Sequence, residues 1–158
     1  MVRESITGCT LCDRELAEPE GGWVYRDQMW SVGVVGGLPD QAGLGSEIPG
    51  WLHGQLRRHA EGLGSLNIDE LASLGPLLAK LYNAVTEVTR PEAVYVVSFV
   101  ERFPHWHFAM LTRGSDVPPE HRAAALVANS ARYSDRLGAF EAGSAIRQVL
   151  RRDGPVTN

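Results

Sequence analysis

The chain has 158 residues, of which 44% are hydrophobic and 22% are charged, and its formal net charge is -4. These values fit one folded domain and exclude a disordered chain, and the acidic balance excludes a broad basic surface for nucleic acid. The first residues lack the apolar run of a secretion signal, and no segment approaches the ~18 apolar residues of a membrane span. We therefore predict a single cytoplasmic domain over residues 1–158, with neither a nucleic-acid nor a membrane partner.

The N-terminal part of the chain predicts three strands. Trp23 to Tyr25 and Trp30 to Val35 are β-rich runs on either side of a polar break, a pattern that indicates a hairpin. Residues 36–50 are rich in Gly and Pro and predict a loop, after which residues 51–59 predict a third strand. If this segment is extended throughout, four polar side chains share one of its faces, namely His53, Gln55, Arg57 and His59.

A helix is predicted from residue 68 onward, because apolar residues recur there at intervals of three and four. The positions are Ile68, Leu71, Leu74, Leu77, Leu78, Leu81 and Val85. Asn67 is a suitable N-cap and is followed by acidic residues in the first turn. Pro76 should bend this helix, and Pro91 marks the place where the chain leaves it.

Two more strands and a helical C-terminal region follow. Ala93 to Val100 and Trp106 to Leu111 are runs of β-branched and aromatic residues, which we expect to form an antiparallel pair. Helical periodicity then occurs in Arg122 to Leu137 and in Phe140 to Leu150, and Gly138 divides the two stretches. Strands around one long helix, with further helices at the end, indicate the α+β class.

Residues 103–113 carry the most informative pattern. On a strand, His105, His107 and Ala109 share one face, so two imidazoles point the same way. The same alternation also arises when a strand buries Trp106 and Phe108 and leaves its histidines on a solvated face. The His-x-His motif therefore needs support from elsewhere in the chain.

Cys9 and Cys12 are the two cysteines of the sequence, and two residues separate them. In a reducing compartment this spacing indicates a metal site or a redox pair before a structural disulfide, and two buried thiols are a further alternative. A redox pair requires a helix directly after the first cysteine within a βαβ pattern, and the sequence predicts neither. Two cysteines with two histidines are a standard ligand set for structural zinc, which we favour.

Several motifs stand in a fixed order between residues 9 and 113. They are the Cys9-x-x-Cys12 pair, Pro49-Gly50, Arg57-Arg58-His59, the helix that starts near Asp69, and Pro104-His105-x-His107 before Arg113. Together they resemble the bacterial branch of the histidine triad (HIT) superfamily. The resemblance implies an antiparallel meander sheet with one long helix between strands, a homodimer joined through the sheet, and hydrolase or transferase activity on nucleoside phosphoesters. It covers little beyond residue 113, so residues 117–152 are expected to be a helical extension of the HIT-like core.

The resemblance also implies roles for individual residues. It assigns a structural zinc ion to Cys9, Cys12, His59 and His105, and it assigns the nucleophile to His107. An imidazole can attack a phosphorus atom and form a covalent nucleotidyl intermediate when its other nitrogen donates to a backbone carbonyl, because that bond fixes the tautomer. We therefore expect such an intermediate on His107.

The sequence departs from the family pattern on the substrate side. Ala109 occupies the third histidine position and can neither donate a hydrogen bond nor carry a proton. Val34, Val35 and Gly36 stand where nucleotide-hydrolysing members have an acidic residue for the ribose. The loss of one donor costs on the order of hundreds-fold in rate, which is compatible with a slow enzyme. It is equally compatible with a non-catalytic binding protein that has lost turnover, so both functions stay open.

Three polar residues are candidates for substrate contacts. His53 and Gln55 are polar where the family strand is usually apolar, so they either line an altered pocket or face solvent. Arg102 lies in the short segment that replaces the family's phosphate loop, and its charge suits a phosphate. The expected ligand is a small phosphoester or a nucleotide.

Overall fold

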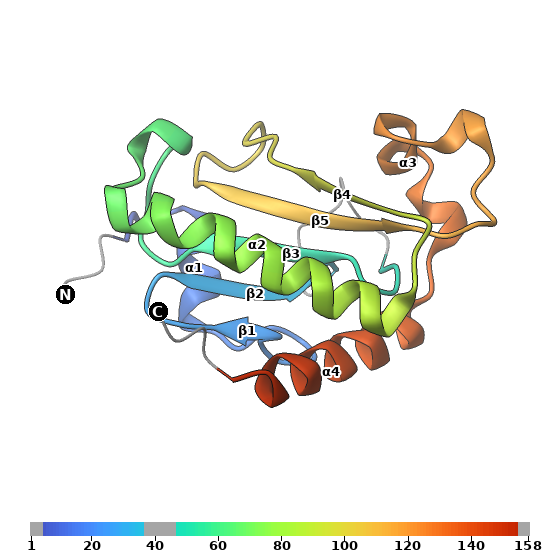
Figure 1. Cartoon of the computed structure of the whole chain (residues 1–158). Helices are drawn as coiled ribbons and strands as arrows, with labels where there is room; N and C mark the ends of the chain where they lie inside the picture. The colour runs from blue at the N-terminus through green and yellow to red at the C-terminus, as the bar shows by residue number, and fades with distance from the viewer. Residues whose placement is uncertain (1–4, 37–46, 155–158) are drawn as a thin grey trace.

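The computed structural model describes residues 5–36 and 47–154 of the chain. These residues form one five-stranded antiparallel sheet in the order β1-β2-β3-β5-β4, with helices on both of its faces (Figure 1). The strands are β1 (Tyr25–Arg26), β2 (Trp30–Val34), β3 (Leu52–Leu56), β4 (Ala93–Val97) and β5 (His107–Arg113). The expected α+β class is confirmed. No helix within the two described ranges is both long and apolar enough to cross a membrane.

The strand order places β5, which begins at His107, beside β3. The first three strands follow one another as a meander, and β4 lies at the far edge because the chain returns through β5 between β3 and β4. The register aligns His53 with Ala109 and Gln55 with His107. The two polar residues of β3 therefore share a sheet face with the predicted nucleophile.

The third strand is shorter than the sequence predicts. β3 ends at Leu56 rather than at residue 59, although the N–H of Arg57 still donates to the carbonyl of Met29, the residue before β2. Arg57 and His59 consequently do not share a strand face with His53 and Gln55. His59 lies instead in the segment that follows the strand.

α2 (Ile68–Thr89) crosses one face of the sheet (Figure 1). The side chain of Asn67 accepts from the N–H of Glu70, and the Glu70 carboxylate accepts in return from the N–H of Asn67. This reciprocal pair satisfies N–H groups that a helix start otherwise leaves without a partner. The helix ends at Arg90, which has a left-handed backbone (φ 46°), directly before Pro91. The predicted helix and its N-cap are confirmed.

The main hydrophobic core lies between the sheet and two long helices, α2 and α4 (Arg136–Arg152). Its buried residues include Trp30, Val32, Leu52, Leu56, Phe108 and Met110 from the sheet or its ends, Leu77, Leu81 and Val85 from α2, and Ala139, Ile146 and Leu150 from α4. A second cluster lies on the other sheet face around Trp51 and Leu111, where α3 (Ala124–Ala128) contributes Leu126.

The C-terminal helices differ from the prediction. α4 begins at Arg136 and runs through Gly138, the residue that was expected to separate two helices. Asp135 caps α4 by accepting from the N–H of Gly138 over 2.9 Å. A Cβ at position 138 would lie 2.2 Å from a carboxylate oxygen of Asp135, so glycine leaves room for this cap. The stretch expected as one helix from residue 122 holds α3 and the single turn Ser130–Tyr133, preceded by the turn Pro119–His121.

A short helix that the sequence does not predict, α1 (Thr10–Leu16), lies on the sheet face opposite α2 (Figure 1). It begins directly after Cys9, so the expectation that no helix follows the first cysteine is wrong. Every strand pair in the described ranges is antiparallel, so the βαβ pattern of a redox pair is absent from them. The spacing of the cysteines must therefore be judged from the groups that surround them.

Candidate metal centre and active site

Four side chains with metal-binding atoms meet beside α1. Cys9 and Cys12 lie one helical turn apart at the start of α1, His59 follows β3, and His105 precedes β5. Their ligand atoms all lie within 4.8 Å of one another, and all four residues are buried. The structure thus brings together the four residues that the resemblance assigned to zinc.

The spacing of these atoms fits a zinc ion. Cys12 Sγ lies 3.4 Å from His59 Nδ1 and 3.5 Å from His105 Nδ1, and Cys9 Sγ lies 3.5 Å from His105 Nδ1. In a tetrahedron with Zn–S of ~2.3 Å and Zn–N of ~2.0–2.1 Å, a sulfur and a nitrogen ligand are about 3.5 Å apart. The donor set, its burial and its distances therefore match a closed structural site.

Hydrogen bonds hold both imidazoles with Nδ1 toward the thiols. His105 Nε2 donates to the carbonyl oxygen of Leu56 over 2.6 Å, and His59 Nε2 donates to the Glu61 carboxylate over 3.3 Å. Each Nδ1 therefore keeps a lone pair for a metal. Burial lowers the pKa of His105 to about 4, which keeps the ring neutral at pH 7. Burial also raises the pKa of the Cys12 thiol to about 11, a shift that a coordinated cation would reverse.

His107, at the start of β5, is half-buried and has a fixed orientation. Its Nδ1 donates to the carbonyl oxygen of His105 over 2.7 Å, which leaves the lone pair on Nε2. The ring of Phe103 lies edge-on to it, with centroids 6.3 Å apart. Burial is the main cause that lowers the pKa of His107, so the ring is neutral at pH 7. A neutral imidazole with a free Nε2 can act as a nucleophile.

His53 lies against His107 and does not face solvent. The two rings stack with centroids 5.1 Å apart and planes 22° apart. His53 is 1% exposed, and its Nδ1 accepts from Arg14 Nη1 over 2.6 Å. Burial, and after it the charge of Arg14, lowers the pKa of His53 well below its ordinary value. The structure therefore brings a neutral His53 to the predicted nucleophile.

The other two predicted substrate residues have different surroundings. Gln55 is fully buried, and its amide nitrogen donates to the carbonyl of Leu11 over 2.8 Å and to the Glu15 carboxylate over 3.0 Å, both in α1. Gln55 thus neither faces solvent nor borders an open pocket, and it holds α1 on the sheet. Arg102 is exposed, with its guanidinium 5.6 Å from the ring centre of Phe103.

Arg14 belongs to this site although sequence analysis does not identify it. It is 5% exposed, and its guanidinium lies between His53 and the indole of Trp23, whose ring centre is 5.2 Å away. Burial lowers the pKa of Arg14 to about 10, which leaves the group charged at pH 7. The sequence signal that could have pointed to a residue such as Arg14 is the polar pair His53 and Gln55, because polar side chains on a covered strand face require polar partners.

Glu15, the next residue of α1, is also buried and escapes sequence analysis. Its carboxylate accepts from Arg26 over 2.9 Å and from Arg57 over 3.3 Å, in addition to Gln55. Two cations and an amide therefore compensate this buried negative charge. Arg57 therefore forms part of this ion pair and does not share a strand face with His53 and Gln55.

Comparison with known proteins identifies the fold. No family model matches the sequence, and no curated protein matches it. The structure is similar to a hypothetical histidine triad nucleotide-binding protein from Sulfolobus tokodaii, with a TM-score of 0.64 and 15% identity over 91% of this chain and 93% of the other. A zinc-bound histidine triad family protein from Mycobacterium smegmatis gives a TM-score of 0.64 and 14% identity over 95% and 98%. The fold is that of the histidine triad proteins.

The structure of a uridylyltransferase is also similar to this chain. Its TM-score is 0.65 at 20% identity, and the match covers 91% of this chain but 45% of the longer one. At such identities the similarity establishes the fold alone. The roles of individual residues depend on the geometry described above.

The residues expected at the third histidine position and at the ribose position are apolar. Ala109 is 4% exposed and belongs to the cluster around Trp51 and Leu111. Val34 and Val35 are buried in the two different clusters, on opposite faces of the sheet. These three side chains offer no hydrogen bond to a substrate.

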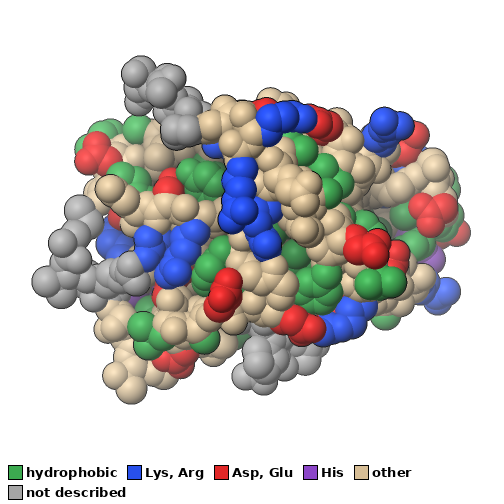
Figure 2. Space-filling model, turned by 90° about the horizontal axis from the view of Figure 1, so that it is seen from below, with side chains coloured by type: hydrophobic (Ala, Val, Ile, Leu, Met, Phe, Trp, Pro, Cys, Tyr) green, Lys and Arg blue, Asp and Glu red, His purple; other side chains and the backbone are tan. Residues whose placement is uncertain are grey.

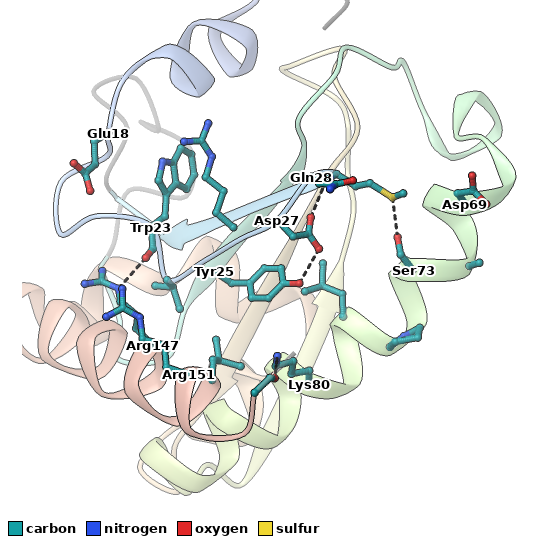
Figure 3. Close-up of a pocket in the computed structure, with 18 residues that line it drawn as sticks. Glu18, Trp23, Tyr25, Asp27, Gln28, Asp69, Ser73, Lys80, Arg147 and Arg151 are labelled. Atoms are coloured by element: carbon teal, nitrogen blue, oxygen red, sulfur yellow. Dashed lines mark hydrogen bonds between the residues drawn. The ribbon is translucent and has the colours of Figure 1, made fainter. Parts of the chain in front are cut away.

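A broad open groove lies away from these residues, between β1, α2 and α4 (Figure 3). None of the eight predicted site residues lines it. Its polar groups serve the fold, since Arg147 donates to the carbonyl of Trp23 and Lys80 donates to that of Gly154. Figure 2 shows basic and acidic side chains interspersed on this side of the molecule. The groove therefore has no uniform charge that would select a phosphate.

Proposed function

We propose that the protein hydrolyses a small phosphoester or nucleotide, or transfers its nucleotidyl group, through a covalent intermediate on His107. The observation that carries this proposal is the 2.7 Å hydrogen bond from His107 Nδ1 to the carbonyl of His105, which leaves Nε2 free to attack. Proteins of the same fold support this chemistry, because one is described as nucleotide-binding and another as a uridylyltransferase.

The proposed reaction has two steps. In the first, His107 Nε2 forms a bond to phosphorus, and the bond to the leaving group breaks with its electron pair on the leaving group, which takes a proton from solvent. In the second, the oxygen of water or of an acceptor hydroxyl attacks phosphorus, the N–P bond breaks with its electrons returning to Nε2, and the attacking oxygen releases a proton. His107 ends the cycle neutral, as it began, and its bond to the His105 carbonyl can persist throughout.

We further propose that Cys9, Cys12, His59 and His105 hold a structural zinc ion. Support comes from their convergence and from the zinc-bound protein of the same fold. When bound, zinc would supply a cross-link between α1, the segment after β3 and the start of β5. The carbonyl of His105 orients His107, so this centre would act on the reaction only by positioning the nucleophile.

The test compares the natural protein with His107→Ala on a nucleoside phosphoramidate and on a dinucleoside polyphosphate. We expect the natural protein to release nucleoside monophosphate and His107→Ala to fall to the background rate. His121→Ala, which removes a histidine that contacts Tyr133 in the C-terminal region, should keep full activity. Intact-mass analysis after rapid acid-free quenching should find the nucleotidyl adduct in the natural protein alone. Equal rates above background in the natural protein and His107→Ala would contradict the proposal.

A non-catalytic binding protein is the second candidate, and the apolar residues Ala109, Val34 and Val35 favour it. Such a protein would keep the zinc-stabilised fold and bind a nucleotide without turnover. Background turnover in both the natural protein and His107→Ala, together with saturable nucleotide binding, would select this function over the enzyme.

The proposal also includes a homodimer joined through the sheet and a cytoplasmic location without a nucleic-acid partner. The HIT resemblance supports the homodimer, and the composition and charge of the chain support the other two points. The edge position of β4 offers a strand for pairing with a second copy.

A further inference from the structure

Arg14 and His53 hold three buried atoms without a hydrogen-bond partner. Among the residues that the structure describes, no other side chain has a buried nitrogen or oxygen of this kind. The atoms are Arg14 Nε, Arg14 Nη2 and His53 Nε2. Both residues are more than nine-tenths buried. Buried polar groups are nearly always hydrogen-bonded, and a buried charged donor without a partner lowers stability. Their concentration in one contacting pair therefore indicates a ligand.

All three atoms are donors, so the missing partner is an acceptor. Arg14 Nη1 donates to His53 Nδ1, which places the proton of the neutral ring on Nε2. The ion pairs found among the described residues include none with Arg14, and the neighbouring Glu15 pairs with Arg26 and Arg57 instead. A buried cation that forms no ion pair, next to a free N–H donor, is complementary to an anion.

The pair lies where the third histidine is missing. His53 is aligned with Ala109 on the neighbouring strand, and side chains in such positions have Cβ atoms ~4.5–5.5 Å apart. The ring of His53 also stacks on that of His107. On its other side His53 is aligned with Gly33, where a Cβ would lie 2.7 Å from Arg14 Nη2, so the glycine leaves room for the guanidinium on the sheet.

We propose that His53 and Arg14 together replace the third triad histidine. His53 Nε2 donates to a non-bridging oxygen of the phosphoryl group that His107 attacks. Arg14 is a positioning residue, because it fixes the tautomer of His53 and offsets the charge of the phosphoryl group. The inference rests on the proposed function for the identity of the reacting group. A donor placed there stabilises the transition state most, because negative charge accumulates on these oxygens during the attack.

Binding of inorganic phosphate, measured by isothermal titration calorimetry, tests this pair apart from turnover. His53→Phe keeps a stacking ring without a donor, and Arg14→Met keeps an unbranched side chain without charge. We expect saturable binding by the natural protein and, for each variant, affinity weaker on the order of ten- to a hundredfold, as the loss of one charge-assisted hydrogen bond predicts. His121→Phe, the same substitution in the C-terminal region, should bind as the natural protein does. If Arg14→Met does not fold, Arg14→Gln takes its place.

Melting temperature and kcat on a nucleoside phosphoramidate separate the possible outcomes. A purely structural role for Arg14 would lower the melting temperature of Arg14→Met and leave its phosphate affinity unchanged, which would overturn the inference. If His53→Phe keeps both kcat and phosphate affinity while His107→Ala is inactive, the inference is wrong and the proposed function stands. If phosphate binding depends on His53 and Arg14 but the natural protein shows only background turnover, the proposed function fails and the pair stands as an anion site. Absence of phosphate binding by the natural protein would also overturn the inference.

Discussion

Gln55 illustrates how one buried side chain sets the position of a helix. It is fully buried on β3, and its amide reaches the backbone of Leu11 and the carboxylate of Glu15 in α1. The same helix carries Cys12 and Arg14, one from the metal centre and one from the anion-binding pair. A change at Gln55 therefore acts on both groups through the helix.

We expect Gln55→Leu to lower the free energy of unfolding by about 1–3 kcal/mol, because two buried acceptors lose their donor while the side-chain volume is nearly kept. Urea denaturation followed by circular dichroism measures this change. Gln28→Leu, at an exposed position between β1 and β2, should alter stability by less than about 0.5 kcal/mol. A Gln55→Leu protein with natural stability would contradict the role of Gln55 in holding α1 on the sheet.

The residues of the candidate site differ in how far the sequence predicts them. The four metal-binding residues and His107 occur in short motifs whose spacing is visible along the chain. The contact between Arg14 and His53 joins residues 39 positions apart and depends on how α1 lies on the sheet. A charged residue is ordinarily expected at the surface, so no local pattern could place Arg14 in the interior.

At the scale of elements, the start of α2 is the helix boundary that the sequence specifies most clearly. Glu70 closes the capping box with Asn67 and also accepts from Arg58 Nε over 2.6 Å and from Arg58 Nη2 over 2.7 Å. Burial alone would raise the pKa of the Glu70 carboxyl, but the hydrogen bonds from Arg58 and from the Asn67 backbone outweigh it and lower that pKa. The ionised carboxylate is therefore bound more strongly in the folded chain than in the unfolded one.

We expect the contribution of Glu70 to stability to disappear in acid. Because the pKa is lowered by folding, the contribution is complete above the ordinary value of 4.5 and is lost as the pH falls through the lowered value. The natural protein should exceed Glu70→Gln in unfolding free energy by about 1–2 kcal/mol at pH 7, and this difference should shrink at pH 3. Asn67→Ala, whose amide does not titrate, should cost about 1 kcal/mol at both pH values. A pH-independent difference for Glu70→Gln would exclude the charge as its cause.

The metal centre joins α1 to the segment after β3 and to the start of β5. A helix of seven residues is too short to be stable by its own backbone bonds, so α1 depends on this centre and on its buried side chains. Loss of the metal should therefore release α1 first.

We expect the natural protein to bind about one zinc ion per chain and His59→Ala to lose it, with a melting temperature lower on the order of 10 °C. Metal analysis of protein purified without affinity metals, with calorimetry on the same samples, measures both effects. His121→Ala removes a histidine outside the centre and should retain the zinc. Full zinc content in His59→Ala would contradict this ligand set.

The elements that the sequence predicts well are those with long and regular apolar patterns, namely α2, β2 and the β4–β5 pair. β1 (Tyr25–Arg26) shares one residue with the predicted run Trp23 to Tyr25. α1 escapes prediction because seven residues barely show a helical period and because tertiary contacts stabilise the helix. The prediction that Gly138 separates two helices is wrong for a different reason. Glycine commonly ends a helix, but here the cap from Asp135 makes it part of a first turn.

At the scale of the whole molecule, β4 forms an edge of the sheet (Figure 1). Val96 is 46% exposed, and Phe99, just beyond the strand, is 55% exposed. An apolar edge strand readily pairs with another chain. The homodimer implied by the HIT resemblance would cover this edge.

We expect light scattering coupled to size exclusion to give the natural protein twice the 17.3 kDa mass of one chain and Val96→Lys a single-chain mass. A charge at an exposed position of the edge strand opposes pairing, while each chain keeps its own core. Leu137→Lys, at an exposed apolar position of α4, should remain dimeric. A monomeric natural protein, or a dimeric Val96→Lys, would remove β4 as the contact.

The strands along the chain and the long helix could be predicted, but neither the place of β5 between β3 and β4 nor the docking of α4 could. Its amphipathic pattern indicates a helix with a buried face and gives no information about which element covers that face. In the structure Gly143 packs against β2 so closely that a Cβ would lie 2.5 Å from Val34 Cγ2. Ala139, Ile146 and Leu150 of α4 therefore form part of the main core.

Cys12 and Arg14 lie two residues apart on the same short helix. The Cys12 thiol of the proposed zinc site and the Arg14 guanidinium of the proposed anion site therefore move together with α1. The zinc ion itself would take no part in the chemistry. Without zinc the sheet would still form, but the carbonyl of His105 that orients His107 and the guanidinium of Arg14 on α1 would both be held less firmly. Metal supply would in this way govern whether the molecule can engage its ligand.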